Sequence, residues 1–291
     1  MSKRGKHRAL LAGWNRSAKA GLFILIFFML VAVFAPVISP YSPNKRTGKP
    51  YERPSAEHLL GTNDIGEDIL SEMIYGTRVS LSVGLLAALG AVALGALLGM
   101  AAGYWGGAVD SVITTLINIL LAVPGFTLTV VLVAYIGSRG IPGMAFLIAV
   151  TSWAGTARVI RTKTRQIREL PFVQIETTFG VPKLVTLVRH ILPNVMDIVG
   201  VRFAMSVGGA MMTETSLSFL GLTSFTTKSW GNVLHYAFFR NGLYKNFWWW
   251  YGPPILCITL CVLSCTMLVN KDKKRLDIRY GARAKGGSEH A

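Results

Sequence analysis

Long apolar blocks, separated by shorter polar segments, divide this 291-residue sequence. A helix needs roughly 20 apolar residues to cross a hydrocarbon layer about 30 Å thick. Six blocks approach or exceed that length, at residues 21–38, 80–104, 112–136, 141–157, 195–222 and 248–269. Because lipid cannot satisfy backbone polar groups, such blocks form helices rather than open sheets. The sequence therefore predicts an all-α integral membrane protein with six transmembrane helices.

Composition agrees with a lipid environment. Hydrophobic residues make up 52% of the chain and charged residues only 15%, whereas a soluble domain carries about a quarter charged residues. The net charge of +16 also suits a nucleic-acid-binding protein. The basic residues, however, lie between apolar blocks rather than on one polar face, which favours membrane topology and no nucleic-acid partner.

The basic residues also predict the orientation. Six spans with an internal N-terminus place twenty Lys and Arg residues in the inside segments and nine in the outside segments, which favours two cytoplasmic termini. The predicted division is a cytoplasmic tail at 1–20, a first span at 21–38, an external loop at 39–79, a transmembrane core at 80–270 and a cytoplasmic tail at 271–291. A cleaved signal peptide is the alternative for the first block, but no clean small-x-small site follows it.

Smaller features have structural explanations beside functional ones. Residues 64–78 show helical apolar spacing, which predicts an amphipathic surface helix within the external loop. Gly95, Gly99 and Gly103 form a small-xxx-small face for close helix packing. The three cysteines share one helical face and are read as packing residues rather than a metal site or disulfides. The aromatic run 247–251 is read as an interfacial anchor, with a ligand-stacking site as the alternative.

The inside segment 158–193 is the most informative region. It is longer than ordinary connections and rich in apolar residues, and Gly180 followed by Pro182 predicts two short helices. Apolar helices held against a membrane favour a docking element for a cytoplasmic partner. A self-packed re-entrant or surface helix pair is the alternative.

Motifs in and around this segment resemble one family. The matching residues in this segment and directly beside it are Trp153-Ala154, Arg158, Arg161, the run 172–176, Gly180 and the run 189–194. Further matches are His58 to Thr62 with Gly66 and 68–71, then 103–107 with Asp110, and finally 217–222 with 230–232. Together they resemble the permease subunits of ATP-binding-cassette (ABC) importers, and within these the C-type subunit of the dipeptide/oligopeptide/nickel permeases. Two departures stand out: Gln174-Ile175-Glu176 replaces the family's Glu-Ala-Ala, and Glu67 replaces the Arg of Gly-Arg-Asp.

This resemblance implies a type I importer (MetI-like) permease fold in the cell membrane, with 158–193 as a cytoplasmic coupling loop. It further implies a homologous B-type permease partner, two cytoplasmic ATP-binding subunits and an external substrate-binding protein. Short peptides are the implied substrates, with nickel or another small solute as the alternative. The residues implied to dock the ATPase are Phe172, Val173, Gln174, Ile175, Glu176, Thr177, Gly180, Leu192 and Pro193.

The chain itself shows no enzyme motif. It lacks a G-x-x-x-x-G-K-[ST] phosphate loop, so ATP and Mg²⁺ are expected only on partner subunits, and no cofactor, catalytic residue or metal ligand is predicted here. An ATP-independent secondary transporter is the alternative class, although no internal repeat supports it. A membrane-bound enzyme is disfavoured by the missing catalytic clusters.

Ionisable residues inside spans are the remaining functional candidates, because they are costly in lipid. Asp197 and Arg202 fall in the fifth span at a poor same-face spacing, so each is expected to pair with another helix. Glu214 lies further along, among polar and adaptable residues. We expect a face of Met211, Met212, Glu214 and Ser216 to line the translocation path. A hydrogen bond from Glu214 to another helix is the alternative.

Overall fold

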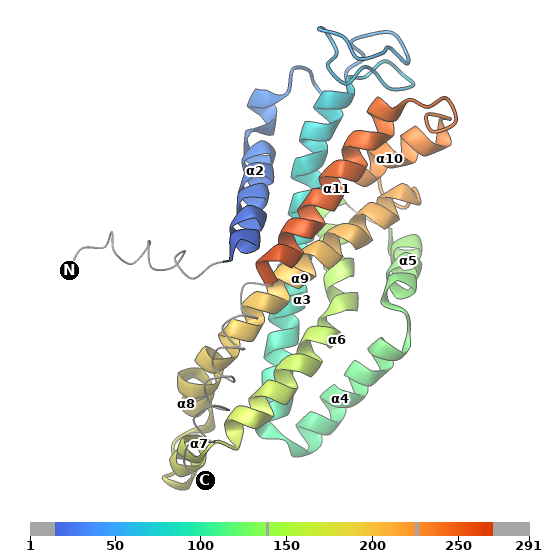
Figure 1. Cartoon of the computed structure of the whole chain (residues 1–291). Helices are drawn as coiled ribbons and strands as arrows, with labels where there is room; N and C mark the ends of the chain where they lie inside the picture. The colour runs from blue at the N-terminus through green and yellow to red at the C-terminus, as the bar shows by residue number, and fades with distance from the viewer. Residues whose placement is uncertain (1–14, 138–139, 225–226, 270–291) are drawn as a thin grey trace, which may run out of the picture.

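Helices form wherever the sequence offers a long apolar block, and they pack into an elongated bundle (Figure 1). The computed structural model describes residues 15–137, 140–224 and 227–269. In those ranges its helices are α2 (Arg16–Ile38), α3 (Ile69–Trp105), α4 (Gly107–Ala122), α5 (Gly125–Ile136), α6 (Gly140–Arg168), α7 (Pro171–Thr178), α8 (Lys183–Thr186), the π-helix η1 (Leu187–Ile191), α9 (Leu192–Phe219), α10 (Trp230–Phe239) and α11 (Trp248–Val269). The predicted all-α class is confirmed.

Five of these stretches are long and apolar enough to cross a membrane: α2, α3, α6, residues 183–219 and α11. Helices α4 and α5 together make a sixth, but they meet at an angle of 86°. We expected one continuous span over 112–136, and the break lies at Pro124, which begins α5. Proline has no backbone N–H and disfavours a helical residue before it, so Val123 is extended and the helix is interrupted.

The surface helix expected at 64–78 is also absent from the described structure as a separate element. Its second half is the first three turns of α3, which runs unbroken from Ile69 for 37 residues. Asp68 begins the helix by accepting a hydrogen bond from the backbone N–H of Ser71. Ile69 and Met73 are buried against other helices rather than lying on a membrane surface. No Gly-Pro or capping signal separates residues 78 and 80, so one helix continues into the span.

Helices α3 and α6 pack against each other through the predicted glycine face. A Cβ atom added at Gly95, Gly99 or Gly103 would lie 2.6–2.8 Å from a backbone oxygen of α6. The three oxygens belong to Trp153, Ala157 and Arg161, which are one helical turn apart. The two backbones therefore touch along two turns, and only glycine fits on the α3 side.

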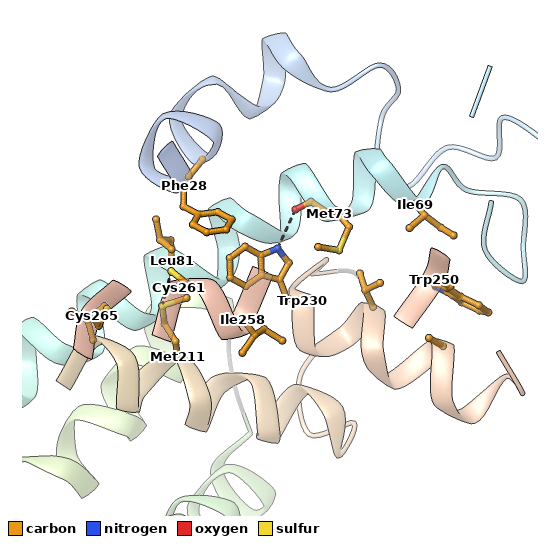
Figure 2. Close-up of a cluster of buried hydrophobic side chains, with 14 of the residues drawn as sticks. Phe28, Ile69, Met73, Leu81, Met211, Trp230, Trp250, Ile258, Cys261 and Cys265 are labelled. Carbon is orange, nitrogen blue, oxygen red and sulfur yellow. Dashed lines mark hydrogen bonds between the residues drawn. The ribbon is translucent and has the colours of Figure 1, made fainter. Parts of the chain in front are cut away.

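A second core joins α2, α3, α9, α10 and α11 around Trp230. Figure 2 shows Phe28 of α2 against the indole ring, with ring centroids 5.4 Å apart. The indole N–H donates to the backbone oxygen of Met73 (3.2 Å), so the buried ring leaves no polar atom unpaired. Cys261 and Cys265 are buried in this core, where Cys261 lies 3.7 Å from the sulfur of Met211. This is the packing role predicted for them.

The end of the bundle opposite α7 and α8 is covered by a cap, which we define as residues 39–68, 220–224 and 227–229 and α10 (Figure 1). His58 Nδ1 lies 3.0 Å from Asp68 Oδ1, and both side chains are buried. The two halves of the cap meet at Lys228, whose ammonium donates to Glu67 (2.5 Å) and to Glu72 (2.6 Å). Asn63 donates to both carboxylates, so these buried charges are paired and hydrogen-bonded.

The pairing at Lys228 predicts a defined pH range of stability. Burial raises the pKa of Glu67, but hydrogen bonds from Lys228 and Asn63 lower the pKa by more than burial raises it. The pKa of Glu67 therefore lies below 4.5. Burial lowers the pKa of Lys228, but the two carboxylates raise it above 10.5. The contribution of Glu67 to the free energy of unfolding is complete above pH 4.5, and it is lost as the pH falls through the lowered pKa of Glu67. The contribution of Lys228 to the free energy of unfolding is complete below pH 10.5, and it is lost as the pH rises through the raised pKa of Lys228.

Replacing Lys228 by Met should destabilise the protein by about 3–5 kcal/mol, because two buried carboxylates lose their counter-charge. The thermal unfolding midpoint in detergent at pH 7 measures this loss. Adding Glu67→Gln and Glu72→Gln to the Met variant should restore most of it. Lys245→Met is the matched control, since Lys245 is exposed and its ammonium lies over the ring of Tyr51. An equal midpoint for the two Met variants would contradict the pairing.

Gly99→Ala should lower stability by about 1–3 kcal/mol, because the added methyl would lie 2.6 Å from the oxygen of Ala157 and neither backbone can move freely. Gly200→Ala is the control: Gly200 is also inside a helix, but its Cβ would meet nothing within 4 Å. The control should be neutral or stabilising by about 0.4–1 kcal/mol. Thermal unfolding compares the two variants, and equal midpoints would refute the close backbone contact.

Candidate functional site

The segment between α6 and α9 is anchored to the bundle by its own apolar residues. Val173 of α7 is fully buried in a cluster with Met100 of α3, Ile160 of α6 and Ile191 of η1. The predicted break at Gly180 separates α7 from α8, and Gly180 has the left-handed φ of +76° that favours glycine. The segment is therefore a fixed part of the fold rather than a loose connection.

On its outer side the same segment leaves large apolar side chains exposed. Phe172 and Ile175 of α7, and Phe179 directly after its end, follow one another at spacings of three and four residues, and Phe179 is 82% exposed. Leu184, Val185 and Val188 are also exposed. We call these six residues the apolar docking face. Contiguous exposed apolar side chains are typical of protein or membrane contacts.

The remaining predicted docking residues take different positions. Glu176 faces back toward η1, where its carboxylate oxygen lies 2.7 Å from Nε2 of His190. The His190 ring also contacts the ring of Phe172, with centroids 5.8 Å apart. Gln174 and Pro193 are exposed, and Leu192 is partly buried. Thr177 is helical within α7. The structure thus separates the anchor Val173, and Glu176 with its partner His190, from the exposed members of the predicted set, which are Phe172, Gln174, Ile175, Gly180 and Pro193.

Two arginines of the motif hold α6 to α4. The guanidinium of Arg161 makes a two-pronged ion pair with Asp110, with Nη2 donating over 2.7 Å. Arg158 donates to the amide oxygen of Asn118 (2.8 Å). About two turns beyond Arg161, Arg168 donates to the backbone oxygen of Tyr104 at the end of α3 (3.2 Å). These contacts fix the direction in which α6 enters the α7 segment.

Glu214 is buried at the junction of α9, α3 and α10, where it accepts hydrogen bonds from Ser80 of α3 (3.1 Å) and Ser218 (2.7 Å). The hydroxyl of Ser80 also accepts from the backbone N–H of Trp230 (3.3 Å). Glu214 thus makes the hydrogen bond to another helix that the alternative interpretation expected. Its side chain links three helices.

The residues proposed for the path lie on two different faces of α9. Met211 is 1% exposed and packs toward Cys261, whereas Met212 is 47% exposed. Ser216 is partly exposed and donates to the oxygen of Met212. Residues 211 and 214 therefore face the interior of this chain, and 212 and 216 face outward. The sequence could not separate the two faces because both combine methionine with polar residues.

Two ion pairs were not predicted from the sequence. The partners Glu67 and Lys228 are 161 residues apart, and Asp110 and Arg161 are 51 residues apart, so no local spacing relates them. Arg202 was expected to pair with another helix, and its guanidinium does so by donating to Thr156 of α6 over 3.2 and 3.3 Å. In the sequence, the position of the charged Arg202 inside an apolar block was the only indication of that contact.

Glu214→Ala should destabilise the protein by about 1–3 kcal/mol, because two buried hydroxyls lose their acceptor. Glu214→Gln keeps one acceptor oxygen and should lose less. Unfolding midpoints in detergent rank the variants, with Met212→Ala as a control on the exposed face. Alanine and glutamine variants that are both as stable as the parent would contradict a linking role.

Comparison with known proteins places these features in a family. Residues 95–277 match the model of the binding-protein-dependent transport system inner membrane component, and residues 14–57 match the N-terminal transmembrane domain of oligopeptide transport permease C. The dipeptide transport system permease protein DppC of Bacillus subtilis is 33% identical over 268 residues, covering 90% of this chain and 82% of the relative.

Two further relatives are named for the transport of other substrates. The glutathione transport system permease protein GsiD of Pectobacterium atrosepticum is 34% identical over 223 residues, covering 75% of this chain and 73% of the relative. The oligopeptide transport system permease protein OppC of Bacillus subtilis is 32% identical over 224 residues, covering 75% and 72%. With the helical bundle and the anchored segment before α9, these matches show that the chain belongs to the family of inner-membrane permease components of binding-protein-dependent transport systems, among the dipeptide, oligopeptide and glutathione permeases.

Proposed function

We propose that this chain forms half of the translocation path of an ABC importer for short peptides. A homologous B-type permease supplies the other half, an external binding protein delivers the peptide, and two cytoplasmic subunits hydrolyse ATP with Mg²⁺. The names of the relatives support short peptides as the substrate class. In this arrangement the cap is external, and the α7 segment and both termini are cytoplasmic, as the basic residues favour.

One observation supports a coupling role for the segment between α6 and α9. The segment exposes the apolar docking face, and it is itself packed into the bundle. Val173 is buried at the junction of α3, α6 and η1, while Ile175 and Phe179 are exposed beside it. A partner that binds the exposed side chains and moves would move the anchor with it. The ion pair of Arg161 with Asp110 would carry that motion from α6 to α4. The segment thereby connects nucleotide-driven motion to the spans.

The test is co-purification of the tagged chain with its partners. Ile175→Asp combined with Phe179→Asp should reduce the recovered ATPase subunits at least about tenfold, because two apolar contacts would each bury an unpaired charge. Thr178→Asp is the control, since it adds a charge to an exposed position of α7 that is not one of the six apolar side chains. Recovery of the B-type permease shows that the variant is folded.

Equal ATPase recovery from the double variant and the control would contradict the proposed docking face. A chain that purifies alone and moves peptide into vesicles without ATP would make the secondary transporter the correct class. An assembled transporter that imports nickel or another small solute, and no peptide, would change the substrate and leave the coupling mechanism in place.

A further inference from the structure

A cavity of about 350 Å³ lies between α3, α5, α6 and α9. Helices α4 and α5 lie on the side of the bundle away from α2 (Figure 1). The cavity borders the core around Trp230 at Ala88, and its other lining residues lie outside the buried residues of that core. Its volume is within the range of about 300–1,000 Å³ that is usual for small-molecule sites. Small residues of three helices form much of the wall: Ala87, Ala88, Ala91, Gly125, Gly209 and Ala210.

Arg202 is the charged residue of this lining. Within the described ranges, no carboxylate lies within ion-pair distance of its guanidinium, which donates only to the neutral hydroxyl of Thr156. Thr156 is itself buried beside Gly95 on the α3–α6 contact, so it holds the guanidinium in place. A guanidinium has five N–H donors, and Thr156 engages two nitrogen atoms. Donors remain for another acceptor.

Several hydroxyl groups of the cavity are already engaged. The hydroxyl oxygens of Thr129 and Thr151 lie 2.9 Å apart, and each also lies within hydrogen-bond distance of a backbone oxygen of its own helix, so the single proton of each is used by one of these contacts. Thr213 donates to the oxygen of Gly209 (3.0 Å). These hydroxyls therefore present mainly acceptor lone pairs to the cavity, and Arg202 supplies its free donors and its positive charge. A cationic fork in a small, largely apolar cavity is suited to one planar anion.

We propose that Arg202 binds the terminal carboxylate of the peptide during translocation, which makes it a specificity-determining residue. This inference rests on the proposed function in peptide import. A charged residue within a span is costly and marks a substrate pathway by default. A free peptide always carries a carboxylate at its C-terminal end, and the small wall residues leave space for the adjoining backbone. The rigid fork of Arg matches that carboxylate in a way that the Lys ammonium does not.

The experiment uses the complete transporter, purified with its partner subunits and reconstituted in liposomes with its binding protein. ATP-driven uptake is measured for alanyl-phenylalanine and for its C-terminal amide. The same binding protein serves every variant, so any change in the ratio of the two uptake rates arises in the membrane subunits. The parent should favour the free carboxylate at least about tenfold, the effect of one charged hydrogen bond. Arg202→Gln should bring the ratio close to one, and Arg202→Lys should give an intermediate ratio.

Arg16→Gln is the matched control, because it removes one positive charge from the exposed start of α2 and should keep the parental ratio. An unchanged ratio in Arg202→Gln would overturn the inference. So would loss of the B-type permease from that variant, since Arg202 would then pair with an acid of the partner. If the parent transports both peptides and its ratio is already near one, only this inference fails. If it transports neither, the proposed function fails and the inference fails with it.

Discussion

The contact between α3 and α6 brings two helix backbones together along three glycines, and the functional parts of the molecule are positioned by it. The strip of α6 that meets Gly95, Gly99 and Gly103 runs from Trp153 to Arg161. The same strip carries Thr156, which orients Arg202, and ends at Arg161, which pairs with Asp110. A small sideways shift of α6 would displace both contacts at once. Association of helices in lipid depends on such close packing, because no hydrophobic force drives them together.

Polar contacts complete the arrangement that packing begins. Each buried charge described above has a partner from a distant segment: Glu214 has Ser80, Lys228 has Glu67 and Glu72, and Asp110 has Arg161. In a low-dielectric interior an unpaired charge is very costly, so these contacts admit few alternative arrangements. Arg202 differs from the ion pairs because its partner is a neutral hydroxyl, and it differs from Glu214 because a single hydroxyl meets a group with five N–H donors. That difference is the reason to look for an outside ligand there.

Much of the fold follows from periodicity and composition, since block length predicts spans and the glycine spacing predicts the α3–α6 face. Sequence reasoning failed where the outcome depended on neighbours. The apolar side of residues 69–73 was assigned to a membrane surface, but Trp230 and the rest of its cluster cover it. Pro124 was visible in the sequence, yet its 86° bend depends on how α4 and α5 pack. For the candidate site, the anchored segment was predicted, whereas Glu176–His190 and Lys228 required contacts between distant positions.

The ion pair within the cap also links two sequence positions that must change together. Where the family that this chain resembles has Arg in Gly-Arg-Asp, this chain has Glu67, and Lys228 supplies the positive charge from the other half of the cap. The sign of the charge at position 67 is thus tied to the residue at position 228. A chimera that took residues 39–79 alone from a relative with Arg would place two cations side by side in a buried site. The two segments form one exchangeable unit, although half the chain separates them.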